Sequence, residues 1–143
     1  MDSHLIVNEC YIQFLEKLLS PAQDLAQCEQ NVKEAVAILA PAVRLGKAEV
    51  VIETPASRLE PEEEHRTIVL YNQGTDVGND VCALRFGLLD RGNVCIFLQP
   101  SGAEPFSKEE REIQNLIGKQ ISNQFSRVIM QGFLTRVIGT DLA

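Results

Sequence analysis

The chain has no tryptophan and only two methionines, two histidines and two tyrosines among its 143 residues. Its four cysteines form no C-x-x-C pair, and none stands near a histidine in the spacing of a zinc site. No apolar run approaches the roughly 18 residues that a membrane-spanning helix requires. These absences argue against a zinc module and against a membrane span, and we expect neither a metal nor a cofactor.

Positive charge is scarce as well. Thirteen lysines and arginines stand against twenty aspartates and glutamates, which leaves a formal net charge of −7. A chain with this balance has no basic patch to neutralise phosphates, so we expect no nucleic-acid partner and no contact with an anionic membrane. The N-terminus carries Asp2 and His4 where a signal peptide would be basic, which predicts a cytoplasmic location.

What is present is the composition of one globular domain, with 45% apolar and 23% charged residues. Each cysteine lies within an apolar periodic segment, a placement typical of reduced thiols packed in a core. The four are Cys10, Cys28, Cys82 and Cys95.

The most informative stretch is the last third of the chain, where apolar residues recur at three- and four-residue spacing. Ser107 and Glu110 have the spacing of a capping box, which predicts a helix over residues 107–137. Such a helix would be roughly 45 Å long at about 1.5 Å per residue. A seven-residue strand covers only about 23 Å. The far end of this helix therefore needs a partner, either a second copy of the chain or a domain that follows it.

Two more helices are predicted near the N-terminus. Residues 5–19 have helical periodicity, and the N-terminal helix is placed at 1–19. Ser20, Pro21 and Gln23 then form a second capping pattern, which predicts the start of a second helix. Pro41 should kink or end this helix, and Gly46 is its expected stop.

After residue 46 the apolar period changes to two. Four mostly antiparallel strands are predicted at 48–54, 67–71, 81–89 and 93–99, the last two joined by a short loop that contains Gly92. The predicted fold class is therefore α+β, an antiparallel sheet with two N-terminal helices and one long C-terminal helix packed on one face.

The last two predicted strands are apolar on both sides, although the helices can cover only one face of the sheet. The other face is thus a candidate ligand cleft or contact surface, with Tyr71, Arg85 and Phe97 as candidate pocket residues. Arg85 could anchor a carboxylate or phosphate there, or form a salt bridge at the sheet surface.

This pattern resembles a GAF domain, the small-molecule-sensing and dimerising module of signalling proteins. The resemblance rests on the two leading helices, the closing hairpin and the Pro-Phe-Ser-Lys-Glu-Glu entry to the last helix at residues 105–110. It implies a GAF-like regulatory domain over residues 1–137 with an unidentified small-molecule ligand. Segment 72–80 is too short for the lid of ligand-binding members, and their Asn-Lys-x-x-Phe-Asp-Glu signature is lacking, so the resemblance implies a minimal, lid-poor form.

Residues 140–143 are similar to the Asp-x-Leu-Thr-Gly start of diguanylate-cyclase-type (GGDEF) domains. This similarity implies that residues 138–143 link to an output domain with a cyclic-di-GMP-related activity. The catalytic residues of that domain would lie beyond Ala143, so this chain itself is expected not to be an enzyme.

The predicted function is that of a regulatory, sensory and dimerisation domain of a bacterial signal-transduction protein, which relays a signal through its C-terminal helix. A homodimer is expected through the N- and C-terminal helices. Its seam would come from those of the following residues that do not pack on the sheet: Ile117, Ile121, Phe125, Val128, Gly132 and Phe133. Two alternatives stay open. One is a purely structural dimerisation module, and the other is a thiol-dependent methionine sulfoxide reductase-like enzyme in which Cys82 and Cys95 face each other across the hairpin.

Overall fold

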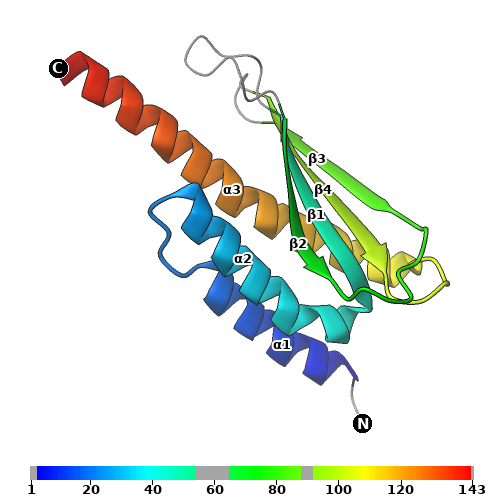
Figure 1. Ribbon diagram of the computed structural model, residues 1–143. Coiled ribbons are helices and arrows are strands. Elements are labelled where there is room, and N and C mark those ends of the chain that lie inside the picture. The colour runs from blue at the N-terminus through cyan, green and yellow to red at the C-terminus, as the bar shows by residue number, and fades with distance from the viewer. Residues whose placement is uncertain (1–2, 54–64, 88–91, 143) are drawn as a thin grey trace.

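In the computed structural model, three helices lie on one face of a four-stranded sheet (Figure 1). The structure describes residues 3–53, 65–87 and 92–142, with side chains described for 8–53, 66–87 and 92–131. The elements in chain order are α1 (Ser3–Leu18), α2 (Leu25–Leu39), the 3-10 helix η1 (Ala40–Val43), β1 (Leu45–Glu53), β2 (His65–Asn72), β3 (Cys82–Gly87), β4 (Asn93–Pro100) and α3 (Lys108–Leu142). The predicted α+β class with a long C-terminal helix is confirmed.

The sheet is antiparallel throughout, in the order β2-β1-β4-β3. The predicted hairpin of β3 and β4 is confirmed, and its turn at residues 88–91 lies outside the described residues. The register between β1 and β2 shifts at Ala48, where β2 contains one extra residue. This bulge has a consequence for the candidate site, because it changes the face on which the following side chain lies.

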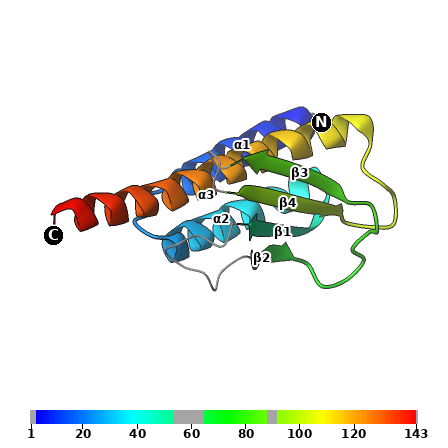
Figure 2. The same cartoon turned by 90° about the horizontal axis from the view of Figure 1, so that it is seen from above.

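The hydrophobic core lies between the sheet and the pair α2 and α3, and it continues between these two helices and α1. Alternate side chains of β1 and β4 point into it, and Phe14 and Phe125 are its largest fully buried members. Helix α1 packs on α2 on the side away from the sheet, where Lys17 Nζ lies 2.6 Å from Glu34 Oε2 (Figure 1). Helices α1 and α3 run in the same direction, and α2 runs against both (Figure 2).

Two local predictions about α2 were wrong. The N-cap is Asp24, whose carboxylate accepts a hydrogen bond from Gln27 N at 2.8 Å, while the Ser20 hydroxyl bonds back to Glu16. Aspartate caps at least as well as serine, so the later residue can take this position. The helical segment ends at Arg44, whose φ of 56° is left-handed, and not at Gly46, which lies inside β1.

The capping box of α3 is confirmed in both directions. Glu110 N donates to Ser107 Oγ at 3.1 Å, and Ser107 N donates to Glu110 Oε1 at 2.9 Å. The helix has 35 residues and continues to Leu142, five residues beyond the predicted end. At about 1.5 Å per residue it is roughly 52 Å long, and its C-terminal part projects beyond the sheet (Figure 1).

Gly46 is required by a close approach of two main chains. A Cβ at this position would lie 2.7 Å from the Pro100 carbonyl oxygen and 3.1 Å from Ser101 Cα. We therefore expect Gly46→Ala to lower the free energy of unfolding by about 1–3 kcal/mol. Gly87→Ala is the matched control, since a Cβ there meets nothing within 4 Å. Urea unfolding measures both variants, and equal stability of the two would contradict this packing.

Candidate functional site

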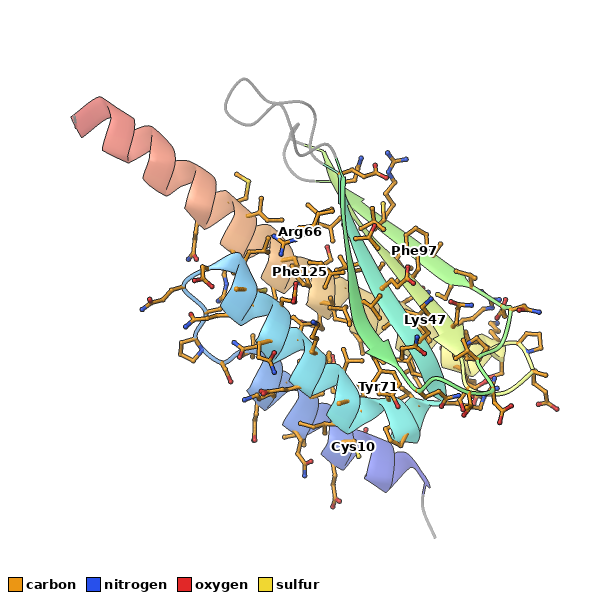
Figure 3. The ribbon with its side chains drawn as sticks, viewed as in Figure 1. Cys10, Lys47, Arg66, Tyr71, Phe97 and Phe125 are labelled. Carbon is orange, nitrogen blue, oxygen red and sulfur yellow. The ribbon has the colours of Figure 1, made fainter. Side chains whose placement is uncertain are left out.

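The helices leave one face of the sheet open, and side chains from all four strands alternate onto it. Figure 3 shows Lys47 and Phe97 on this side, away from the helices. The register places two rows of residues across β1, β4 and β3 on this face: Val51, Cys95 and Arg85, and next to them Glu49, Phe97 and Ala83. We call this surface the open face.

The charges of the open face are paired within the chain. Lys47 Nζ lies 2.7 Å from Glu49 Oε1, and Arg85 Nη2 lies 3.8 Å from Glu53 Oε2. The Arg85 side chain is 69% exposed. Of the two roles considered for Arg85, the structure shows the salt bridge at the sheet surface.

Two of the three predicted pocket residues share the open face, namely Arg85 and Phe97. Tyr71 lies on the other face, because it stands opposite Ala48, which is fully buried beneath the helices. Simple alternation would have put Tyr71 on the same side as Val69. The extra residue in β2 turns it toward the helical side instead.

Cys82 and Cys95 do not face each other, so this part of the thiol-enzyme alternative was wrong. Cys82 stands opposite Leu98 on the helical side, whereas Cys95 stands opposite Arg85 on the open face. Burial raises the pKa of both thiols, and it raises the pKa of Cys28 to about 11. A raised pKa lowers the fraction of thiolate, the form that reacts.

Four residues of the predicted dimer seam are used within the chain's own core. Their side chains are at most 5% exposed and contact the sheet and α2: they are Ile117, Ile121, Phe125 and Val128. Gly132 and Phe133 lie outside the part of α3 whose side chains and burial are described. Figure 3 shows Phe125 beneath Arg66, between the helices and the sheet.

One arginine fixes the start of α3. Arg44 directs its side chain at the segment that joins β4 to α3, and each of its five guanidinium N–H groups has an acceptor. Nε and one of the two N–H groups of Nη2 donate hydrogen bonds to the two carboxylate oxygens of Glu110, both at 2.9 Å. The other three bond to the main-chain carbonyl oxygens of Ser101, Glu104 and Pro105, at 2.8–3.0 Å.

This ion pair is electrostatically strong because both partners are only about 30% exposed and the contact is bidentate. The Arg44 guanidinium, assisted by the Ser107 main-chain N–H, holds the pKa of Glu110 down at about 2. The Glu110 carboxylate in turn raises the pKa of Arg44. Sequence reasoning identified Glu110 through its capping box but had no signal for a partner 66 residues away.

Two further contacts hold the first turns of α3. Arg111 Nη2 lies 2.7 Å from Asp80 Oδ1, and the same carboxylate accepts a hydrogen bond from Phe106 N at 3.0 Å. Gln114 is fully buried, and its Nε2 donates to the Val43 carbonyl at 3.0 Å. The base of α3 is therefore attached to η1, to the residues that precede β3, and to the loop after β4.

Compared with protein families, with curated proteins and with solved structures, this chain shows no match. The resemblances to a GAF domain and to the start of a GGDEF domain therefore stay predictions. Within the described part of the chain, no helix is long and apolar enough to cross a membrane. The same residues contain no cluster of three or more His, Cys, Asp or Glu side chains placed to hold a metal ion.

The lowered pKa of Glu110 predicts an acid-sensitive fold. Its folded-state pKa is below its unfolded value, so the carboxylate stabilises the fold fully above about pH 5, and this contribution is lost as pH falls from 4.5 toward 2. We expect Glu110→Gln to cost on the order of 2 kcal/mol at pH 7 and to flatten the loss of stability between pH 5 and 2. Urea unfolding at several pH values measures this.

Glu104→Gln is the control for that experiment, because it removes an exposed carboxylate nearby and keeps the carbonyl that Arg44 contacts. If the stability of Glu110→Gln depended on pH as that of the original chain does, Glu110 would not be the source of the acid sensitivity.

The thiols provide a second test. We expect Cys28, Cys82 and Cys95 to react slowly with a disulfide reagent at pH 8 in the folded protein, because burial raises the pKa of each. Titration in denaturant should then release all four thiols quickly. Fast reaction of three or more thiols in the folded chain would contradict the burial seen here and would revive the thiol-enzyme alternative.

Proposed function

We propose that this chain is a regulatory and dimerisation domain of a bacterial, cytoplasmic signal-transduction protein, and that α3 relays its signal to a downstream domain. The observation that carries the proposal is that α3 is held firmly at its start and extends beyond the sheet at its end. It is clamped at its first turn by Arg44, packed on β3 and β4 along its first half, and projects beyond the sheet in its last part (Figure 1).

A contact between α3 and the sheet offers a route for the signal. At Gly118 the helix lies so close to β3 that an added Cβ would collide with the Leu84 side chain and contact Ile96. Leu84 and Ile96 belong to the same two strands that carry Arg85 and Phe97 on the open face. A small molecule held on the open face would shift β3 or β4, and α3 would move with them.

The nature of the downstream domain is proposed from the sequence. Residues 140–143 are similar to the start of a GGDEF domain, which supports a cyclic-di-GMP-related output after residue 143. In this proposal the present chain has no catalytic role, and its ligand is an unidentified small molecule.

A second candidate function is a structural dimerisation module that binds no ligand. It is favoured by the ion pairs of the open face, because Lys47 with Glu49 and Arg85 with Glu53 already use the charges that an anionic ligand would need. Native mass spectrometry distinguishes the two candidates.

We expect native mass spectrometry of the purified 143-residue chain at low micromolar concentration to show a dimer that carries a stoichiometric additional mass. Arg85→Glu should then lose that mass, because the added carboxylate repels an anion on the open face. Arg66→Glu is the matched control on the helical side of β2, and it should keep the mass. A dimer without additional mass would favour the structural module, and a monomer would contradict the dimerisation.

A further inference from the structure

A regular stripe of exposed residues follows the outer side of α3. Its members recur at three- and four-residue spacing and are all exposed: Glu109, Glu112, Leu116, Lys119, Asn123 and Arg127. The stripe begins with acidic side chains, has the 47% exposed Leu116 near its centre and carries its basic side chains in its second half. It does not overlap with Ile117, Ile121, Phe125 and Val128, which face the core.

Helix α1 continues this surface. Burial raises the pKa of the Tyr11 hydroxyl, and the nearby Gln120 side chain of α3 opposes this shift, whereas Lys17 is paired with Glu34 of α2. On a helical wheel, Ile12 and Leu19 follow the Tyr11 side and lie away from α2. They are 56% and 55% exposed, the two most exposed large apolar residues of those described. We call the stripe together with Ile12 and Leu19 the α1–α3 flank.

The charges of the flank differ from those of the open face. Among the residues whose side chains are described, Glu109, Glu112, Lys119 and Arg127 form no ion pair within the chain. Arg127 only donates a hydrogen bond to Gln124 at 2.7 Å. Within the described side chains, these four charges therefore lack a partner of opposite sign.

We propose that the α1–α3 flank binds a second copy of this chain, with the two α3 helices antiparallel about a two-fold axis that crosses the stripe at the level of Gly118 along the helix. Glu109 and Arg127 stand at equal separations before and after Gly118, so each Glu109 meets the partner's Arg127. The two Leu116 side chains then lie about 6 Å apart along the axis, at the centre. A parallel pairing would instead place each charge of the stripe opposite its own copy, which is repulsive.

The stripe on α3 is long enough for a contact along one helix. From Glu109 to Arg127 the helix is about 27 Å long, and with its side chains it is about 10–12 Å across. The stripe alone therefore gives a flat footprint on the order of 300 Å², to which Ile12 and Leu19 of α1 add, against the about 800 Å² per partner of standard interfaces. The apolar contribution comes from Ile12, Leu19 and Leu116.

This inference rests on the dimerisation in the proposed function and specifies its geometry. In the antiparallel dimer the projecting ends of the two α3 helices leave at opposite ends. Each downstream domain would then respond to its own sheet through its own α3, and no coiled coil would be shared between the two copies.

The first experiment reverses the two charges singly and together in the 143-residue chain and measures the dimer dissociation constant of each variant by sedimentation velocity. Glu109→Arg and Arg127→Glu should each raise the dimer dissociation constant about tenfold, because each breaks two symmetric ion pairs. The double variant should return the constant to within about threefold of the original value. Arg66→Glu reverses an exposed charge on β2 as a matched control and should leave the constant unchanged.

Cysteine cross-linking gives the second, independent readout. An equimolar mixture of Glu109→Cys and Arg127→Cys chains should form a disulfide-linked heterodimer on mild oxidation, while neither variant alone should link to itself. The unsubstituted chain serves as the blank for its native thiols, which are buried or half-buried.

The outcomes separate the inference from the function on which it rests. Self-linking of Glu109→Cys, or charge reversals without effect on a stable dimer, would overturn the antiparallel geometry and leave the proposed dimerisation standing. A monomer at all concentrations up to about 100 μM would overturn both. A chain that binds ligand as a monomer would overturn the inference and still support a sensory role.

Discussion

The position of α3 depends on the ion pair between Arg44 and Glu110. Arg44 ends η1 in a left-handed conformation, and its five N–H groups are all satisfied by acceptors within residues 101–110. A partly buried charge pair contributes to stability only when its desolvation is offset by good geometry and additional hydrogen bonds, and both conditions are met here. A single side chain thereby joins the helical layer, the loop after β4 and the first turn of α3.

This attachment makes the two ends of α3 unequal. The first turns are held by Arg44, by Asp80 through Arg111 and by Gln114, whereas the last part of the helix projects beyond the sheet. Between them, Gly118 allows the helix to lie directly on Leu84. In the proposed function, a helix that is fixed at one end and in close contact with the sheet in its middle would convert a small shift of β3 into a larger displacement of its far end. This is the physical argument for the proposed relay.

Features determined locally were predictable from the sequence. The capping box of Ser107 and Glu110 and the antiparallel hairpin needed only short-range patterns, and both are found. Features that depend on distant contacts were not predictable. The bulge that moves Tyr71 to the helical face has no signature in the alternation of β2, and the Arg44 partner lies 66 residues away. Apolar periodicity showed that α3 buries a stripe, but it could not say whether the stripe faces its own sheet or a second chain.

An exposed charge is not by itself evidence of a partner, because water solvates it well. The order of charges along α3 carries more information. The helix dipole accounts for Glu109 in the first turn, since its field favours acidic groups there and falls off within about one turn. It does not account for Lys119 and Arg127, which lie far from the C-terminal turn at Leu142. In the proposed dimer, a second α3 runs in the opposite direction and brings its acidic end to these basic side chains, which lie on the same stripe as the acidic ones.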